Sequence, residues 1–300
     1  MKTVRRVKIS GLGTYVPPRV LTNHDLEKLV ETTDEWILQR TGIRERHIAD
    51  PGVATSDIAA PAARAAIAEA GLTPNAIGFI VVGTTTPDTI FPSTACVLQD
   101  KIGARSAWGF DLGAACSGFT YAVTSAWSMV ATGAVEHALA VGADVMSSII
   151  DFLHEIDGSG GPALCMPAGG SRRPASHETV DQRLHYVKQD GQTVFKFAVK
   201  KNQDIALRLL ERNGLTGADL DFYISHQANR RIIEATAERL GMGEDKVIIN
   251  LDRFGNTTAG TIPLALADAR ASGRLKKNNL VMLASVGAGF TVGSVLLRWP

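Results

Sequence analysis

The chain has 300 residues, of which 45% are hydrophobic and 20% are charged, and its formal net charge is +1. Its length corresponds to two domains or half-domains of about 150 residues, and its composition excludes a disordered chain. The almost neutral charge argues against broad binding to nucleic acid or to a membrane surface. Three cysteines do not make a disulfide scaffold, and no apolar stretch approaches about 18 residues, so we expect a cytoplasmic protein without membrane spans.

Strand and helix patterns alternate along the chain, which predicts an α/β fold. A first strand is expected at Val7–Gly13, followed by a helix at Ser56–Ala70 that Ser56 caps. Buried strands are expected at Ile77–Gly83 and Ala138–Gly142.

The second half of the chain repeats the first. Gly71–Phe79 resembles Gly214–Phe222, and Gly133–Gly142 resembles Gly273–Gly287 in the same order and at nearly the same offset. A repeat of this length fits a duplicated α/β unit rather than a solenoid, whose repeats have about 20–50 residues. We therefore predict two halves, residues 1–150 and 151–300, with a Gly/Pro-rich surface loop at about 157–174 and a site between the halves.

Cys116 follows a predicted strand that ends near Leu112 and precedes a predicted helix that begins near Ser117. A thiol at a helix N-terminus faces the positive end of the helix dipole, which favours the thiolate. Its neighbours are small and would let a substrate come close. We predict that Cys116 is a nucleophile, and we interpret Cys96 as a buried hydrophobic residue and Cys165 as structural.

Two polar residues are candidates for partners of Cys116. His226 ends the predicted strand Asp221–His226, and ligands collect at strand ends in α/β sheets. The other six histidines lie in polar segments that we expect to be exposed, and a core or surface histidine is the alternative interpretation of His226. Asn256 follows a predicted strand near Leu251; its amide suits an oxyanion, but on the sequence alone a helix cap is the preferred interpretation.

Other chemistries lack their motifs. The sequence contains no Gly-x-Ser-x-Gly elbow, no His-Glu-x-x-His and no Gly-x-x-x-x-Gly-Lys loop. The glycines of Val286–Gly293 precede only a short strand, so they do not form a dinucleotide fingerprint. No His/Cys cluster has zinc spacing, so no metal is expected.

Five segments, taken together and in order, resemble β-ketoacyl-acyl-carrier-protein synthase III, the enzyme family that starts bacterial fatty-acid synthesis. Its Cys, His and Asn motifs are matched by Asp111–Phe119, Ser225–Ile232 and Asp252–Thr258. Thr33–Ile48 and Gly287–Thr291 match further signatures of the family.

The resemblance implies a thiolase-like fold, with two duplicated βαβαβαββ halves in five alternating layers, assembled as a homodimer. It implies a decarboxylating Claisen condensation of a starter acyl-CoA, acetyl-CoA in the first instance, with malonyl-acyl-carrier-protein. No cofactor is held permanently, because CoA thioester and phosphopantetheine act as substrates. Acyl-CoA, acyl carrier protein and a second copy of the chain are the implied partners.

The resemblance also implies roles for individual residues. Cys116 attacks the thioester, with the carbonyl oxygen held by its own backbone N–H and that of Ala288, while His226 and Asn256 stabilise the enolate. The remaining implied sites are the CoA and pantetheine contacts Trp36, Arg40, Phe195 and Ala228, the cap on the partner's acyl pocket Phe91, and the carrier-protein docking residues Lys196, Gln227, Arg230 and Arg231.

The chain departs from the family pattern at three places. Val286 replaces a usual Phe and Val292 replaces a usual Trp, and a stretch of some twenty to thirty residues that ends in a sheet strand is absent after Ile149. Two other functions stay open: a related condensing enzyme of secondary metabolism with another starter, and a non-catalytic module that binds acyl groups or carrier protein. The length of the starter chain does not follow from the sequence.

Overall fold

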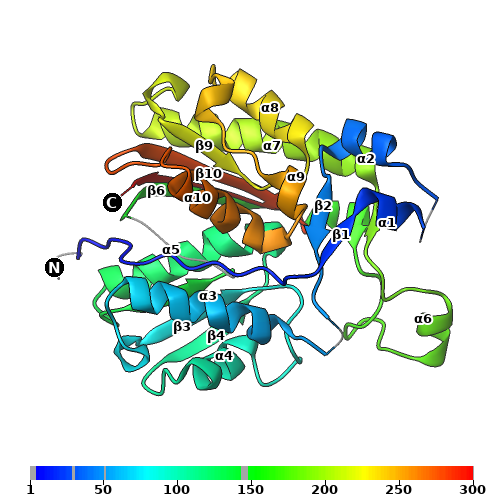
Figure 1. The fold of residues 1–300 in the computed structure, drawn as a ribbon, viewed down its shortest axis with the longest axis horizontal. Helices are drawn as coiled ribbons and strands as arrows, with labels where there is room; N and C mark the ends of the chain where they lie inside the picture. Colours follow the sequence, from blue (N-terminus) through cyan, green and yellow to red (C-terminus); the bar gives the residue numbers. More distant parts are fainter. Residues whose placement is uncertain (1–4, 29–30, 51, 143–147, 300) are drawn as a thin grey trace.

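The computed structural model describes residues 5–28, 31–50, 52–142 and 148–299. Two sheets form its centre (Figure 1). The N-terminal sheet has the order β4–β3–β5, and all three strands are parallel. The C-terminal sheet has the order β6–β11–β10–β9, in which β10 and β9 are parallel and the other pairs antiparallel.

The strands of the N-terminal sheet are β3 (Phe79–Gly83), β4 (Trp108–Leu112) and β5 (Ala138–Val141), and those of the C-terminal sheet are β6 (Ser148–Ile156), β9 (Phe222–Ser225), β10 (Leu280–Gly287) and β11 (Thr291–Arg298). The helices packed on them are α3 (Thr55–Glu69), α4 (Thr94–Ile102), α5 (Gly118–Ala131), α7 (Gly191–Arg212), α8 (Arg230–Arg239) and α10 (Thr261–Ala271). The smaller elements are β1 (Val20–Thr22), α1 (Asn23–Glu27), α2 (Asp34–Thr41), β2 (Glu45–His47), β7 (Leu164–Cys165), α6 (His177–Asp181), β8 (Lys188–Gln189) and α9 (Leu251–Phe254).

The elements stack in five alternating layers, as the family resemblance implies. In Figure 1, α5 and α10 lie between the two sheets, with α7 and α8 outside the C-terminal sheet and α3 and α4 against the N-terminal one. Helices on both faces explain why β3 and β10 are apolar and buried along their whole length. No described helix is long and apolar enough to cross a membrane.

The repeat found in the sequence is preserved in the pairing of the strands. Phe79 of β3 faces Ala138 of β5, and Phe222 of β9 faces Val281 of β10. In residue numbers, the second pair follows the first by the same separation that lies between Gly71 and Gly214. The last residues of α3 and α7 are separated by this number as well. The two sheets are therefore equivalent, with β5 corresponding to β10.

Several local predictions are wrong. No strand forms at Val7–Gly13. Ala54 rather than Ser56 is the N-cap of α3, because Ser56 lies inside the helix and donates to the carboxylate of Asp88. The segment at Leu251 is the helix α9, so no strand precedes Asn256 there.

The Gly/Pro-rich stretch at 157–174 is more ordered than a surface loop. It holds a 3₁₀ segment at Gly158–Ala163 and the strand β7, which pairs with β8. The strand β6 lies wholly in the C-terminal sheet although it crosses the expected boundary at residue 150. The division between the halves therefore falls before Ser148.

Candidate active site

Cys116 lies in a short 3₁₀ turn, Ala115–Ser117, between β4 and α5. Ala115 has a φ of 44°, a left-handed conformation that a residue with a side chain adopts only under constraint. Burial raises the pKa of the Cys116 thiol to about 11, and a hydrogen bond from its own backbone N–H opposes this only in part. The thiol is therefore protonated at neutral pH, and the expected thiolate-favouring effect of the helix N-terminus does not prevail.

The C-terminal half holds this turn in place. Thr291 donates from Oγ1 to the carbonyl of Ala114 at 3.0 Å, and Ser117 donates from Oγ to the carbonyl of Thr291 at 3.3 Å. A Cβ atom added to Gly287 would lie 2.8 Å from the backbone nitrogen of Cys116. Only glycine fits there, because the end of β10 lies directly against the nucleophile turn.

His226 follows β9 and is 5% exposed. Its backbone N–H donates to the carbonyl of Ala284 at 2.8 Å, and its Nδ1 lies 2.6 Å from Oγ1 of Thr261. Burial lowers the pKa of His226 to about 4, so the imidazole is neutral at pH 7. The side chain is a buried, hydrogen-bonded neutral base or donor, not a surface histidine.

The hydroxyl proton of Thr261 decides which tautomer His226 adopts. The Oγ1 atom of Thr261 also lies 3.1 Å from the carbonyl oxygen of Thr258, to which the hydroxyl can donate a hydrogen bond. When it does so, it accepts from Nδ1–H of His226, and Nε2 is then free to accept a proton. When it donates to Nδ1 instead, Nε2 keeps its proton and acts as a donor.

Asn256 is exposed, and its Oδ1 accepts a hydrogen bond from the backbone N–H of Thr258 at 2.9 Å. This contact is the cap-like role that the sequence favours. It also fixes the orientation of the side chain. The oxygen Oδ1 is occupied by this contact, and the two N–H groups of Nδ2 are left to donate to a ligand. Both interpretations of Asn256 are therefore compatible.

The turn Thr258–Gly260 connects the three residues. It binds Asn256 through the N–H of Thr258 and precedes Thr261, which contacts His226. The same turn packs against Ala115–Ser117, which carries Cys116. Residues from both halves thus converge where β4, β9 and β10 end, as expected for a site between duplicated units.

The predicted CoA and docking residues lie on neighbouring elements. The guanidinium of Arg40 lies 5.8 Å from the ring of Trp36 on α2, and Trp36 is 56% exposed. Asn229 donates to the carbonyl of Arg40 at 2.9 Å, which fastens α2 to the start of α8. Ala228, half-buried, lies two residues from His226.

The exposed basic side chains Lys196, Arg230 and Arg231 belong to α7 and α8, which lie side by side (Figure 1). The guanidinium of Arg231 lies 4.9 Å from the ring of Phe195, which is half-buried. The basic residues therefore form a surface next to the half-buried aromatic residue.

Gln227 does not belong to that surface. It is 1% exposed, its Nε2 donates to the carbonyls of Ser225 and Ile248, and its Oε1 accepts from the N–H of Asn250. Its prediction as a docking residue is wrong, because both ends of the amide are used inside the protein. It braces the loop that follows β9.

The apolar residues near the predicted dimer contact are exposed. Phe91 is 84% exposed and Ile90 is 89% exposed, in the loop before α4. Trp108 and Phe110 are 52% and 39% exposed on β4, which pairs with β3 on one side and with no other described strand. Exposed apolar residues on an open sheet edge are typical of an interface.

The two valines that depart from the family pattern occupy one place. Val286 and Val292 face each other across β10 and β11, and both are buried in one apolar cluster with Ile205 and Ile232. A Phe at position 286 and a Trp at position 292 would both add volume to this cluster. The two valines therefore reduce the size of side chains at the same place in the core. Phe195 packs against the same cluster, which relates the change to the predicted pantetheine contact.

Some cysteines and histidines differ from expectation. Cys96 is exposed rather than buried, and Ser93 donates to its sulfur. His154 is not exposed, and burial lowers its pKa to about 4. Among the described residues no group of three or more His, Cys, Asp or Glu side chains could hold a metal.

Sequence reasoning missed three supporting residues: Thr261, Gly287 and Thr291. Gly287 and Thr291 belong to a segment that matches a family signature, and Thr261 lies three residues after the segment Asp252–Thr258, which matches another. Gly287, the last residue of β10, allows the close approach to Cys116, a contact that its sequence motif does not reveal. Thr261 carries no signal of its own in the sequence, because its partner is distant along the chain.

Comparison with known proteins agrees with these features. Two family models match, described as 3-oxoacyl-[acyl-carrier-protein] synthase III over residues 110–169 and its C-terminal region over residues 210–299. A β-ketoacyl-[acyl-carrier-protein] synthase III of Koribacter versatilis is 52% identical, covering 100% of this chain and 99% of that protein. One of Solibacter usitatus is 53% identical, covering 98% and 99%.

Solved structures show the same likeness. The 3-oxoacyl-(acyl carrier protein) synthase III of Pseudomonas aeruginosa superimposes with a TM-score of 0.89 at 34% identity, covering 99% of each chain. The priming β-ketosynthase of the R1128 polyketide pathway superimposes with a TM-score of 0.88 at 30% identity, covering 100% of this chain and 99% of that one.

Proposed function

The chain belongs to the 3-oxoacyl-[acyl-carrier-protein] synthase III family, and from this membership and the geometry of the site we propose that it condenses an acyl-CoA starter with malonyl-acyl-carrier-protein. The product is a 3-ketoacyl-acyl-carrier-protein, which initiates fatty-acid synthesis. The observation that carries the proposal is the convergence of Cys116, His226 and Asn256 on the turns at 115–117 and 258–260.

The first half-reaction transfers the acyl group to Cys116. Its buried thiol needs a base, and neutral His226 accepts the proton at Nε2 when Thr261 binds Nδ1–H. The sulfur attacks the thioester carbonyl, whose oxygen is held by the backbone N–H groups of Cys116 and Ala288. The C–S bond to CoA then breaks, and CoA leaves with the proton.

The second half-reaction forms the carbon–carbon bond. Malonyl-acyl-carrier-protein loses CO₂, and the electron pair of the broken C–C bond forms an enolate. Its oxygen is stabilised by Nε2–H of His226 and Nδ2 of Asn256, both neutral donors that do not protonate the carbanion. The enolate carbon attacks the acyl-Cys116 carbonyl, the C–S bond breaks, and the departing thiolate of Cys116 takes up a proton from solvent, because its original proton left with CoA.

The substrates would enter along the surface between α2 and α8. Trp36 and Arg40 would bind the adenine end of CoA, and Phe195 and Ala228 would line the pantetheine path. Lys196, Arg230 and Arg231 would dock the acidic carrier protein. A homodimer through β4 would bury Trp108 and Phe110 and place Phe91 at the partner's acyl pocket.

A condensing enzyme of secondary metabolism is the second candidate. It is favoured by the paired valines Val286 and Val292 and by the likeness to a priming β-ketosynthase at 30% identity. A binding module without activity is disfavoured, because the buried base and the strained nucleophile turn have no purpose in it.

Turnover with a panel of starters tests the proposal. The protein should release CO₂ and form a 3-ketoacyl-acyl-carrier-protein from malonyl-acyl-carrier-protein with acetyl-CoA, and Cys116→Ala should lower the rate by at least about 1,000-fold. A preference for a longer or branched starter would favour the second candidate. Unchanged turnover in Cys116→Ala would refute the mechanism.

A further inference from the structure

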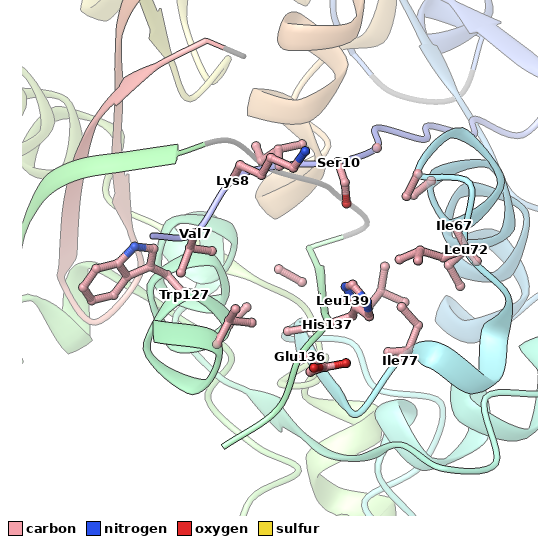
Figure 2. A pocket seen from close by; sticks show the side chains of 18 of the residues that line it. Val7, Lys8, Ser10, Ile67, Leu72, Ile77, Trp127, Glu136, His137 and Leu139 are labelled. Atoms are coloured by element: carbon pink, nitrogen blue, oxygen red, sulfur yellow. The ribbon is translucent and has the colours of Figure 1, made fainter. Parts of the chain in front are cut away.

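A cavity of about 260 Å³ lies in the N-terminal half, away from the nucleophile turn. Figure 2 shows it between the N-terminal segment, which carries Val7, Lys8 and Ser10, and β5, which carries Leu139. Helix α3 contributes Ile67 and helix α5 contributes further apolar side chains to its walls. The cavity therefore has a strand on one side, an extended segment on the other and a helix at each face.

The internal repeat shows what belongs between β5 and the N-terminal segment. In the C-terminal sheet, β11 lies between β10 and β6, antiparallel to both. The equivalent of β10 is β5, and the offset of the repeat places β6 (Ser148–Ile156) onto residues 5–13. The cavity therefore takes the position that β11 occupies in the other half, and no described strand fills it.

The backbone of β5 is oriented to receive a strand there. The carbonyl of His137 accepts from the N–H of Gly78, toward β3. Backbone groups alternate in direction along a strand, so those of Ala138 and Ala140 point the other way, into the cavity. The same alternation is found in the C-terminal half. The carbonyl of Leu280 accepts from the N–H of Asp221, toward β9, whereas the next residue, Val281, pairs with Leu297 of β11 on the other side.

The chain itself is too short to supply this strand. In the C-terminal half β11 follows β10 after three residues and has 8 residues of its own. Only six residues separate Val141 from Ser148. The alignment with the Koribacter versatilis relative runs over 331 positions although this chain has 300 residues, so at least 31 positions have no counterpart here.

The repeat also corrects the expected place of the absent stretch. The sequence put it after Ile149, but Ile149 lies inside β6 and pairs with Leu297. The equivalent of β11 has to follow β5, before Ser148, where residues 143–147 lie outside the described part of the chain. The repeat therefore places the missing strand between β5 and β6.

We propose that this cavity is an open strand position and that it binds, from a separate polypeptide, an apolar β-strand equivalent to β11 of the C-terminal half. The strand would add antiparallel to β5 through Ala138 and Ala140 and to the segment around Val7–Gly11. Helices cover both faces, so its side chains must be uncharged on both sides. Lys8, Glu136 and His137 line the cavity as well, which allows polar residues only at the strand's ends.

Peptide binding tests the proposal with readouts that do not depend on activity. The probe is a fluorescein-labelled synthetic peptide with the sequence of the Koribacter versatilis relative that aligns between Val141 and Ser148, and a scrambled peptide is the control. Binding is followed by fluorescence anisotropy, and hydrogen exchange of the segment 138–141 is followed by mass spectrometry. We expect saturable binding of the probe alone and at least about tenfold slower exchange at β5.

Two variants locate the bound peptide. Ala126→Phe on α5 fills the cavity and should weaken binding at least tenfold, whereas Ala134→Phe, an exposed position outside the cavity, should leave it unchanged. Ala140→Pro removes an N–H that faces the cavity and keeps the hydrogen bonds between β5 and β3, so it should also weaken binding. It provides an independent test if Ala126→Phe does not fold. Absence of binding, or binding that survives both folded variants, would overturn the proposal.

Discussion

In the C-terminal half, β10 has a strand on each side, whereas the equivalent β5 of the N-terminal half has a described neighbour only at β3. Cys116, the proposed nucleophile, nevertheless belongs to the less complete half. Its turn is held by Thr291 and by the close approach of Gly287, both from the complete half. The position of the Cys116 turn therefore depends on contacts between the halves more than on the completeness of the sheet beneath it.

Among substitutions that leave Cys116 itself in place, the largest expected effect comes from breaking the contact at Gly287. In Gly287→Ala the new Cβ would lie 2.7 Å from Oγ1 of Thr291 and 2.8 Å from the backbone nitrogen of Cys116, so the nucleophile turn must shift. We expect acyl transfer to fall by about 100-fold or more, because misplacing a reacting group by about 1 Å has this effect. Rates of Cys116 acylation measure it.

The matched control is Gly191→Ala at the start of α7, where the added Cβ meets nothing within 4 Å. Its acylation rate should equal that of the unaltered protein. Equal rates in Gly287→Ala and Gly191→Ala would show that β10 does not position the nucleophile.

A smaller effect is expected from Thr261. Thr261→Val keeps the shape of the side chain but removes the partner of His226 Nδ1. Turnover should fall by about 10- to 100-fold, as for the loss of one positioned acid–base group, and Thr261→Ser should restore most of it. The pH dependence of kcat/KM should shift in Thr261→Val but not in Thr261→Ser; a loss of activity with an unshifted profile would indicate a purely structural role.

The pH dependence of stability reports on the burial of His226. Its pKa is about 4 in the folded protein, whereas a solvated histidine in an unfolded chain has a pKa of about 6.5. Between these pH values the unfolded chain binds a proton that the folded protein does not, so stability falls as the pH falls. At pH 5 the loss due to this histidine is about 2 kcal/mol.

Urea unfolding at pH 7 and pH 5 measures the decrease in the free energy of unfolding. In His226→Asn this decrease should be smaller by about 2 kcal/mol. His154 titrates in the same direction and remains in both proteins, so it cancels in the difference. An identical loss in the variant would mean that His226 is not buried as described.

The smallest effect is expected at the proposed docking surface of Lys196, Arg230 and Arg231, which lies wholly on the C-terminal half. Arg231→Ala should raise KM for malonyl-acyl-carrier-protein several-fold, as for the loss of one exposed charge contact, without changing the rate of acylation by acyl-CoA. The effect should weaken as salt is raised. An equal change in both half-reactions would mean that Arg231 acts on the site itself, for example through Phe195.

The fold, and the meeting of the Cys116, His226 and Asn256 segments between the halves, could be predicted from the sequence because their signals are local or repeated. The constant offset between the matching segments of the two halves revealed the duplicated units, and the turn chemistry around Cys116 and His226 marked two strand ends. Gln227 was grouped with Arg230 and Arg231, which lie a few residues further along the sequence and are exposed, whereas its burial follows from contacts with Ile248 and Asn250.

Other features depend on contacts between distant segments and could not be read from the sequence. The pairing of His226 with Thr261 joins two elements 35 residues apart. The pKa of Cys116 is set by burial, which outweighs the local effect of the helix N-terminus. The first strand at Val7–Gly13 was expected from its own pattern, but a strand needs a neighbour, and the position between it and β5 is open.

The most direct test of the central claim is intact-mass measurement with peptide mapping after incubation with acetyl-CoA, and separately with longer acyl-CoAs. The account predicts a single acyl adduct on Cys116, absent in Cys116→Ala and greatly slowed in Gly287→Ala. A folded protein that forms no adduct with any acyl-CoA, or an adduct on Cys96 or Cys165 instead, would contradict it.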